Sequence, residues 1–334
     1  MRRAVVSLLT VAAIALAAAV AGSLGGLRFA LAVFVPYAAA ATLLLGLSYR
    51  VIRWSLSPVP FRITATCGQQ KTLPWIQSSR LDNPHTALGA AARMALEILL
   101  FRSLFRNTRT KLGRPGGLPR LSYVEDKWLW LGALAFHWSL LVILIRHLRF
   151  FVEPVPKPAL FLESLDGFFQ IGAPVLYLTD AAILLALLYL LQRRLRDPLI
   201  RYISLFTDYF ALFLLLGIAI SGVWMRYFTR VDVVAVKQLA VGLAIFSPAL
   251  PANPGALFFV HLALVSVLAA YLPFSKLIHM GGVFLSPTRN LANDNRMKRH
   301  VNPWNYPVKV HTYEEWEDEF REKIEAAGLP VERR

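Results

Sequence analysis

The chain has 334 residues, of which 56% are hydrophobic and only 17% charged, with a formal net charge of +16. About a quarter of the residues of an ordinary soluble domain are charged, so the composition excludes that class and indicates a membrane protein. On so apolar a chain the excess of Lys and Arg is typical of membrane topology, an interpretation we favour over nucleic-acid binding. With Cys67 as its single cysteine, the chain cannot build an internal disulfide or supply all the thiolates of an iron–sulfur cluster.

A membrane-spanning helix needs about 20 mainly apolar residues, and six stretches of the chain meet this requirement. In chain order they are 4–24, 29–49, 128–149, 171–191, 203–223 and 256–277. The first stretch also resembles a signal peptide, but a second apolar stretch follows at once, so we expect an uncleaved anchor. The predicted fold class is an all-α membrane protein with six transmembrane helices.

Lys and Arg gather in alternate loops. Residues 50–127 carry thirteen of them, the short segment 192–202 carries four, and the tail after Lys276 is basic, whereas 150–170 and 224–255 hold few. The positive-inside rule therefore predicts a multi-pass protein of the cytoplasmic membrane with both termini in the cytoplasm. The predicted parts are a transmembrane hairpin (1–49), a cytoplasmic loop (50–127), a four-helix region (128–280) and a cytoplasmic tail (281–334).

The cytoplasmic loop has a segment with helical periodicity. Its apolar stripe is Met94, Ile98, Phe101 and Phe105, and its basic stripe is Arg102, Arg106 and Arg109. Such an amphipathic helix lies in the membrane interface, docks a partner, or packs on its own loop, and the sequence leaves these alternatives open.

The tail contains a second amphipathic helix, predicted over residues 312–327. Thr312 and Glu315 form a capping box at its start, and Gly328 follows its end. The apolar stripe of this helix is Tyr313, Trp316, Phe320 and Ile324. A stripe of this size on a short tail indicates a surface that it covers, in this chain or in another.

Four of the seven histidines lie in or at the ends of predicted spans, where an unpaired polar side chain is costly. His137 and His147 are in the third span, and His261 and His279 are in or just past the sixth. Because these two spans run in opposite directions, we expect His147 and His261 near the outer face and His137 and His279 further inward. Two histidine pairs at two depths are what two bis-histidine b haems require. The other three histidines lie in polar loops and are expected to be solvated: His85, His300 and His311.

The histidine spacings fit this arrangement imperfectly. Eighteen residues are five helical turns, so His261 and His279 share a face, whereas ten residues leave His137 and His147 about 80° apart. The axial rises also differ, at roughly 15 Å and roughly 27 Å. We expect helix tilt and a kink at Pro273 to absorb part of the mismatch. The alternative is a non-redox transporter or scaffold with interhelical histidine bonds; zinc is disfavoured because no Cys, Asp or Glu completes a tetrahedral set.

The histidine spacings resemble those of the cytochrome b subunit of respiratory nitrate reductase, the gamma-subunit family. The resemblance implies that His137 and His279 hold the proximal haem iron and that His147 and His261 hold the distal one.

Three further stretches resemble subunit M of the Dsr electron-transport complex: "CGQQKTLPWI", "LDNP" with "RMALEILLFRSLFRNT", and the tail "NDNRMKRHVNPWNYPV". That resemblance implies two haem b cofactors, menaquinol or another quinol as substrate, and a role in dissimilatory sulfur metabolism. It also implies further Dsr subunits, a cytoplasmic iron–sulfur partner resembling the catalytic subunit of heterodisulfide reductase, and indirect exchange with a small sulfur-carrier protein.

A few charged residues complete the candidate site. Arg146, beside His147, suits a propionate of the distal haem or is an ordinary snorkelling arginine. Lys276 is either a partner of the proximal propionates or a topology anchor. Asp180, placed mid-span, is a candidate proton acceptor for quinol, whereas Asp208 is expected to bond neighbouring helices or the region of the proximal haem. Cys67 either approaches the partner's cluster or is an incidental thiol, and we favour the latter. The direction of electron flow stays open.

Overall fold

The computed structural model describes residues 2–57, 68–106, 109–124, 126–170, 174–252, 254–286, 289–297 and 310–332. Cys67, His300 and the tail segment 298–309 lie outside the described residues, so the expectations stated for them stay predictions.

The described chain is mainly helical. Its α-helices are α1 (Arg2–Ser23), α2 (Val35–Ser55), α3 (Ala87–Leu100), α4 (Arg102–Phe105), α5 (Lys127–His147), α6 (Lys157–Asp166), α7 (Leu178–Arg196), α8 (Pro198–Ile203), α9 (Phe206–Trp224), α10 (Val233–Ala244), α11 (Ala256–Tyr271), α12 (His279–Gly282) and α13 (Tyr313–Ala326). Short 3-10 or π-helical turns are η1 (Gly25–Leu27), η2 (Ala30–Phe34), η3 (Pro115–Gly117), η4 (Leu148–Phe150), η5 (Met225–Thr229), η6 (Leu272–Phe274) and η7 (Lys276–Ile278). Two antiparallel hairpins pair β1 (Arg109–Gly113) with β2 (Arg120–Val124) and β3 (Gly167–Phe169) with β4 (Leu176–Tyr177).

Five stretches of the described chain are long and apolar enough to cross a membrane. They are Arg2–Ser23, Gly25–Ser55, Lys127–Phe150, Phe206–Thr229 and Ala256–Phe274. A helix satisfies its own backbone hydrogen bonds, which is what a segment in hydrocarbon requires. These stretches correspond to five of the six predicted spans, so the chain is a multi-pass membrane protein.

The fourth predicted span, 171–191, differs from the prediction. Helix α7 begins only at Leu178, after strand β4, and it carries Asp180 in its first turn and three arginines in its last turn. Its uncharged part is therefore short, and α7 is not among the five stretches that could cross a membrane by length and composition.

Helix α7 nevertheless packs antiparallel to α5, and ion pairs join the two helices at both ends. Arg193, in the last turn of α7, lies 3.0 Å from Asp126, which caps the start of α5. At the other end, Arg146 of α5 lies 3.5 Å from Asp180 of α7. The two helices thus reach equally far along the bundle.

Three clusters of buried side chains hold the bundle together. The first joins α5, α7 and α9 through Phe136, Ile183, Ala186, Leu187, Leu215 and Leu216. The second joins α1, α9 and α11 through Val11, Phe210, Leu214 and Leu264, and the third joins η2, α10 and α11 through Ala32, Val33, Leu239, Phe258 and Phe259. Helix α2 lies along α11. The clusters therefore lie at helix seams, as in other membrane bundles.

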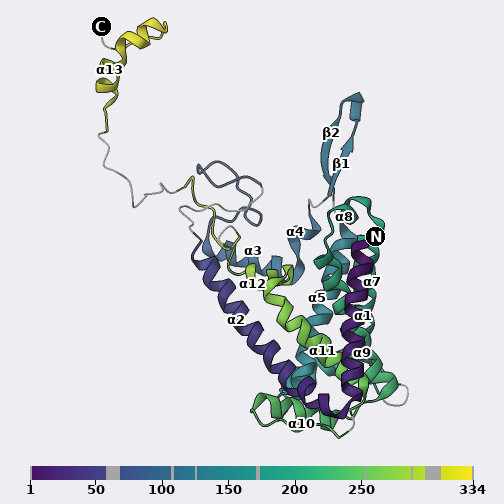
Figure 1. Ribbon diagram of the computed structural model, residues 1–334. Helices are drawn as coiled ribbons and strands as arrows, with labels where there is room; N and C mark the ends of the chain where they lie inside the picture. The colour runs from purple at the N-terminus through teal and green to yellow at the C-terminus, as the bar shows by residue number, and fades with distance from the viewer. Residues whose placement is uncertain are drawn as a thin grey trace.

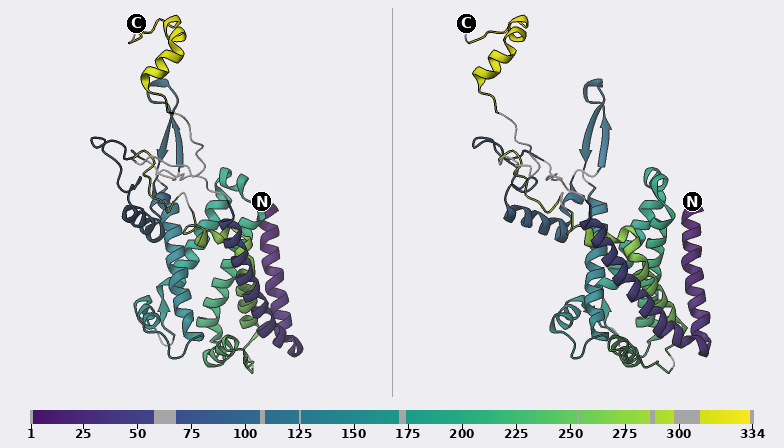
Figure 2. Two further views of the ribbon diagram at one scale, coloured as in Figure 1. Left: turned by 90° about the vertical axis from the view of Figure 1, so that its left-hand side faces the viewer. Right: turned by 60° about the vertical axis from the view of Figure 1, so that its left-hand side comes forward.

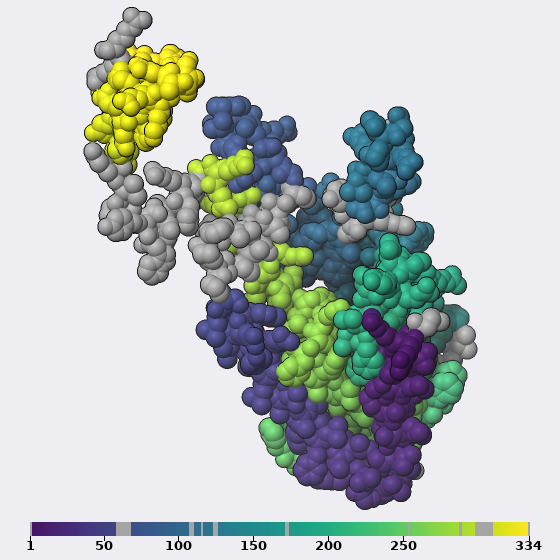
Figure 3. Space-filling model, turned by 45° about the horizontal axis from the view of Figure 1, so that its top comes forward, coloured from purple at the N-terminus to yellow at the C-terminus, as the bar shows by residue number. Residues whose placement is uncertain are grey.

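The elements that do not belong to the long helices lie at the two ends of the bundle (Figure 1). The N-terminus, α3, α4, the β1–β2 hairpin, α8 and α12 lie at one end, and α10 lies at the other (Figures 1 and 2). At the first end, the loop 68–86 contacts the segment 289–297, because Asn293 bonds Asn83 at 2.7 Å and Gln70 at 2.8 Å (Figure 3). The segments predicted to share one side of the membrane thus lie together.

The amphipathic helix predicted in the cytoplasmic loop is broken in the structure. Helix α3 ends at Leu100, and Phe101 adopts a left-handed backbone conformation with φ 49° and ψ 46° before the short α4 begins. Arg102 and Arg106 both pair with Asp82, and Arg109 belongs to β1, so the predicted basic stripe does not form on one helix. The hydrogen bond from Arg102 holds the pKa of Asp82 below its usual value, against the opposing effect of burial.

The tail helix is confirmed as α13. The Thr312 hydroxyl accepts a hydrogen bond from the Glu315 backbone, the Glu315 carboxylate accepts one from the Thr312 backbone, and Gly328 follows with a φ of 70°. Tyr313 and Trp316 of its apolar stripe are 53% and 44% exposed, so they are available to a further surface.

Candidate functional site

The inner histidine pair comes together as expected from the antiparallel course of the two spans. His137 lies in the middle of α5, and His279 is the first residue of α12. The centres of the two imidazole rings are 6.0 Å apart, and their planes are inclined by 79°. The structure therefore places these two side chains side by side, although 142 positions separate them in the chain.

A break in the last span brings His279 to this position. Helix α11 ends at Tyr271, the 3-10 turns η6 and η7 follow, and Ser275 between them is extended, with ψ 175°. The predicted mismatch between rises of roughly 15 and 27 Å assumes a continuous helix, which this segment is not. The expected disturbance at Pro273 is thus confirmed, and it is a full interruption rather than a kink.

Helix α2 contacts the break. A Cβ atom on Gly46 would lie 2.7 Å from the Pro273 ring, so only glycine permits this approach. One turn later, the Arg50 Nε donates a hydrogen bond of 2.9 Å to the Pro273 carbonyl oxygen, which the interrupted helix leaves without an i+4 donor. The N-terminal hairpin therefore supports the segment that carries His279.

The break between α3 and α4 lies against His137. The Phe101 ring meets the His137 imidazole edge to face at 4.9 Å, as does Phe136 from the neighbouring position on α5. The indole groups of Trp130 and Trp138 donate hydrogen bonds of 2.6 and 3.0 Å to the carbonyl oxygens of Leu100 and Leu99, at the end of α3. A left-handed conformation is unusual for an aromatic residue, and here it turns the chain so that Phe101 covers the inner pair.

The outer pair consists of His147, the last residue of α5, and His261, in the second turn of α11. Because α5 and α11 run in opposite directions, the end of α5 and the start of α11 place both side chains at the end of the bundle away from the inner pair. Gly222 of α9 adjoins this pair, because a Cβ atom there would lie 3.2 Å from the His261 ring. The two pairs are therefore at two levels of the bundle, and each joins α5 to the segment that begins with α11.

In all four histidines the Nδ1 atom has a hydrogen-bond partner. The Nδ1 atoms of His137, His147 and His279 lie 2.8, 2.7 and 2.8 Å from the carbonyl oxygens of Ala133, Ile143 and Lys276. A carbonyl can only accept, so each of these Nδ1 atoms carries the proton.

The partner of His261 is different, because it comes from another helix. Its Nδ1 lies 2.9 Å from the Ser221 hydroxyl of α9, and that hydroxyl donates to the Ile218 carbonyl oxygen at 3.0 Å. Because the Ser221 hydroxyl proton is used in the bond to Ile218, the Ser221 oxygen accepts the hydrogen bond from the His261 Nδ1–H group. All four imidazoles thus keep the Nε2 lone pair for a ligand, as metal-binding histidines do when their other ring nitrogen donates a hydrogen bond.

These residues fit a haem better than a protein-bound metal ion. The described residues contain no group of three His, Cys, Asp or Glu side chains that could hold a metal ion. A haem needs only two axial ligands, because the porphyrin supplies the others. Helices α5 and α11 do not pack closely along their length, in contrast to α5 with α7 and α11 with α2. His147 and His279 are exposed, and His137 and His261 are half-buried, so none of the four residues is closed off in the core of the bundle.

A buried network of charged residues adjoins the outer pair. Arg146 lies 2.5 Å from the Asp166 carboxylate, donates to the Thr179 hydroxyl at 3.0 Å, and stacks 3.4 Å above the Tyr177 ring. Asp166 also accepts from the Thr179 backbone at 2.8 Å, at the start of α7. Arg146 is therefore no solvated snorkelling residue. Carboxylates of the same chain already pair with Arg146, and a haem propionate at this position would share the guanidinium with them.

Asp180 belongs to the same network, and its predicted position mid-span is wrong. It lies in the first turn of α7, where a carboxylate is favoured by the helix dipole. Its carboxylate accepts a hydrogen bond of 2.7 Å from the Tyr227 hydroxyl and lies 3.5 Å from Arg146. Asp180 is thus near the end of the bundle that holds the outer histidines.

Glu163 lies at the edge of the network, outside the spans. Burial raises the pKa of Glu163, but the hydrogen bond from Tyr177 and the charge of Arg149 outweigh it and hold the pKa below its usual value.

Lys276 and Asp208 lie at the opposite level, near the inner pair. Asp208, in the first turn of α9, pairs with Lys276 at 2.8 Å and with Arg194 of α7 at 3.7 Å, so it joins neighbouring segments as expected. The Lys276 side chain is 72% exposed, which leaves its ammonium accessible to a further anion such as a propionate.

Several residues of the site were not found from the sequence. Ser221, Phe101 and Tyr227 contact candidate residues from elements far along the chain, and no local motif marks them. Trp130 and Trp138 could have been singled out from the sequence, because a tryptophan in an apolar segment needs a hydrogen-bond acceptor for its N–H group.

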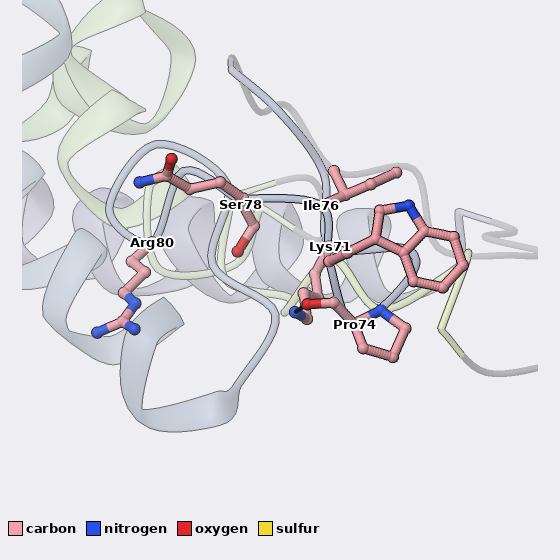
Figure 4. A pocket seen from close by; sticks show the side chains of 7 residues that line it. Lys71, Pro74, Ile76, Ser78 and Arg80 are labelled. Carbon is pink, nitrogen blue, oxygen red and sulfur yellow. Dashed lines mark hydrogen bonds between the residues drawn. The ribbon is translucent and has the colours of Figure 1, made fainter.

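The structure also has a surface pocket of about 520 Å³ within the loop 68–86 (Figure 4). Lys71, Pro74 and Arg80 are among its lining residues, and none of the four histidines lines it. Trp75 at this pocket is 77% exposed. The pocket therefore does not belong to the histidine site.

Comparison with known proteins adds a family and two relatives. The nitrate reductase gamma subunit family matches residues 90–299, which include all four histidines of the two pairs. An Archaeoglobus fulgidus protein described as an Hdr-like menaquinol oxidoreductase cytochrome b-like subunit is 47% identical over 281 residues, 81% of this chain and 82% of the relative. An Archaeoglobus profundus protein with the same description is 42% identical over 277 residues, 81% of each chain.

Proposed function

The chain belongs to the nitrate reductase gamma subunit family, and we propose that it is a membrane cytochrome b subunit of a quinol oxidoreductase complex. In this proposal it holds two b haems and passes electrons between a membrane quinol and a cytoplasmic iron–sulfur subunit. The description shared by its two relatives, an Hdr-like menaquinol oxidoreductase, supports menaquinol as the quinol and a heterodisulfide-reductase-like protein as the partner.

The observation that carries the proposal is the state of the four imidazoles. Each Nδ1 is held by an oxygen acceptor, the rings of His137 and His279 lie side by side, and His147 and His261 both lie at the other level of the bundle. In a scaffold with interhelical histidine bonds, each imidazole would bond to another helix. Only the Ser221–His261 bond fits that alternative, since the Nδ1 atoms of the other three histidines bond to carbonyl oxygens of their own segments. Haem, when bound, supplies one-electron transfer, and the chain supplies orientation, axial ligands and exclusion of water.

Further residues have roles within this proposal. Oxidation of a quinol releases two electrons and two protons, and Asp180, bonded to Tyr227 next to the outer pair, is the proposed proton acceptor. Arg146 and Lys276 are the proposed cationic partners of the distal and proximal haem propionates. The direction of flow follows the haem potentials, and the same site would also reduce a quinone if the partner supplied the electrons.

The proposed topology has six crossings. Helix α7 is counted as a crossing because its ion pairs with both ends of α5 require it to run the full length of the bundle. The end that carries the N-terminus, α3, α8 and α12 is assigned to the cytoplasm on the positive-inside rule. The bundle from 128 to 280 is then the haem-binding part, with 50–127 and 281–334 in the cytoplasm.

The finer assignment is subunit M of a Dsr complex. It rests on the motifs around residues 67–76, 81–84 and 93–108 and on the tail. It places the chain in dissimilatory sulfur metabolism, with electrons reaching a small sulfur-carrier protein through the iron–sulfur subunit and the other Dsr subunits.

Haem content tests the proposal. The purified chain should give two haem b per polypeptide in a pyridine haemochrome assay. Absence of haem in a folded preparation would leave the scaffold alternative.

Single substitutions test the pairing. His137→Ala and His279→Ala should each remove the inner haem, and His147→Ala and His261→Ala the outer haem, with one haem retained in every case. Loss of the same haem from His137→Ala and His261→Ala would contradict the pairing.

A further inference from the structure

An apolar groove of about 550 Å³ lies between α1, α9 and α11. Its lining residues are almost all hydrocarbon side chains, and Ser221 carries the one hydroxyl group among them. Leu8, Ile220 and Trp224 at its rim are 48%, 51% and 50% exposed, so the groove opens at the surface that faces lipid. Its volume is in the range of small-molecule sites, roughly 300–1,000 Å³.

The groove reaches the outer histidine pair. Ser221 is both a lining residue and the acceptor for the His261 Nδ1, at 2.9 Å. Val260 and Leu264, on either side of His261 along α11, also line the groove. A molecule in this groove would therefore be separated from His261 only by the α9 and α11 side chains that hold the imidazole.

Helix α1 forms the third wall of the groove, through small side chains. Ala12 and Ala15 of α1 line it together with Gly217 of α9, and the small size of these residues leaves the space open. The family match begins at residue 90, so α1 lies outside the matched region. The groove is thus a feature that the N-terminal hairpin adds to the bundle.

From these observations we infer that the groove binds the isoprenoid tail of the quinol and directs its headgroup to the outer histidine pair. This inference rests on the proposed function. The quinol headgroup itself does not suit the groove, because its two O–H protons need hydrogen-bond acceptors, and the indole N–H of Trp224 can only donate. The only hydroxyl there already accepts from His261 and donates to the Ile218 carbonyl oxygen. A branched hydrocarbon chain has no such need.

Shape decides binding in this environment. Inside a bilayer an apolar chain gains little from leaving lipid, so van der Waals packing against the walls selects the occupant. Filling the groove from the α1 side should therefore exclude the tail and leave Ser221 and His261 untouched. Ala12→Leu with Ala15→Leu does this, and Ala13→Leu with Ala17→Leu adds the same volume to exposed positions of α1 that do not line the groove.

The experiment uses the full-length haem-loaded protein in nanodiscs and two quinols with the same headgroup. One is a menaquinol with an isoprenoid tail, and the other is menadiol, which has none. The rate of outer-haem reduction is measured against the concentration of each quinol. The wild-type protein and the Ala13/Ala17 control should show a lower KM for the tailed quinol. The Ala12/Ala15 variant should lose that difference, with the maximal rate from menadiol unchanged.

Other results overturn the inference. Unchanged kinetics with the tailed quinol would mean that the groove holds only bilayer acyl chains. Equal slowing with both quinols would mean that the substitutions disturb the redox site itself.

A second measurement does not depend on haem. Extraction and mass spectrometry should find less quinone retained per chain in the Ala12/Ala15 variant than in the control, and equal retention would also overturn the inference. Failure of dithionite to produce a haem spectrum in the wild-type protein would instead refute the proposed function.

Discussion

At the scale of single residues, the outer pair depends on a hydrogen bond between helices. His261 donates from Nδ1 to Ser221 of α9, which donates onward to the Ile218 carbonyl oxygen. Such a bond increases the basicity of the imidazole and fixes the ring orientation. The three other histidines obtain the same effect from backbone carbonyl groups, which no side-chain substitution removes. Ser221 is therefore the most informative position for testing how a hydrogen bond to the imidazole affects this site.

Ser221→Ala should raise the midpoint potential of the outer haem and leave that of the inner haem unchanged. Without its acceptor, His261 becomes a weaker electron donor and stabilises the ferric state less. The half-buried His261 also loses the partner of its Nδ1–H group, which costs about 1 kcal/mol of folding stability. Potentiometric titration of both haems checks this prediction, and Ser221→Thr, which keeps the hydroxyl, is the control. A shift of the inner haem, or of neither haem, would contradict it.

At the scale of elements, two interruptions of helices shape the inner pair. The break after Tyr271 brings His279 to His137, and the break at Phe101 places an aromatic ring over His137. Side chains of neighbouring helices stabilise both interruptions. Helix α2 packs Gly46 and Arg50 against the first, and the indole groups of α5 bond the carbonyl oxygens at the second. Backbone groups released by a broken helix in a membrane need such partners.

Gly46→Leu should remove the inner haem and retain the outer one. The new side chain would meet the Pro273 ring, where a Cβ atom alone already lies at 2.7 Å, and would push α2 from the segment that carries His279. Overpacking of this kind costs about 1–3 kcal/mol. Haem per chain and the reduced spectrum are the measurements. Ala41→Leu, at an exposed position of α2, is the matched control and should keep both haems. Two haems in Gly46→Leu would show that α2 does not position His279.

At the scale of the whole molecule, the proposed electron transfer at the end of the bundle that carries the N-terminus needs a partner protein, because a chain with one cysteine cannot supply the thiolates of an iron–sulfur cluster. Within the described residues, apolar side chains at that end are exposed on α13, on the β1–β2 hairpin and in the loop 68–86, as with Trp316, Leu112 and Trp75. Large aromatic anchors dominate the energy of most protein interfaces. The tail helix adds seven acidic residues against two basic ones, in contrast to the basic remainder of the chain. It therefore suits a partner surface with basic and apolar groups.

Deletion of residues 312–334 should leave both haems in place and weaken copurification of the iron–sulfur subunit. The double substitution Trp316→Ala with Phe320→Ala should act in the same way, with a loss of about 2 kcal/mol or more of binding free energy, as is typical of interface hot spots. Glu322→Ala, away from the apolar stripe, is the control.

Pull-down of the partner by each variant gives the answer. Undiminished recovery by the truncated chain would mean that α13 serves its own subunit only, and loss of a haem would mean that the tail is structural.

The sequence alone determined the features that depend on composition and local pattern. Apolar length located five of the spans, the distribution of Lys and Arg predicted which segments share an end of the bundle, and Thr312, Glu315 and Gly328 marked both ends of α13. The grouping of His137 with His279 followed from the antiparallel course of two spans, which needs no coordinates. These features could be predicted because each follows from the preference of a segment for lipid, water or helical backbone.

Only the tertiary structure decided the features that depend on packing between distant segments. The start of α7 at Leu178, the left-handed Phe101, the interruption at Pro273 and the Ser221–His261 bond all arise where one segment meets another. Helical periodicity predicted an unbroken helix through Phe101, because a local pattern carries no information about the indole groups and the imidazole that stabilise the break. The groove beside His261 likewise exists only because small residues of α1 and α9 meet the side chains of α11 there, and the space between helices is not encoded in any one of them.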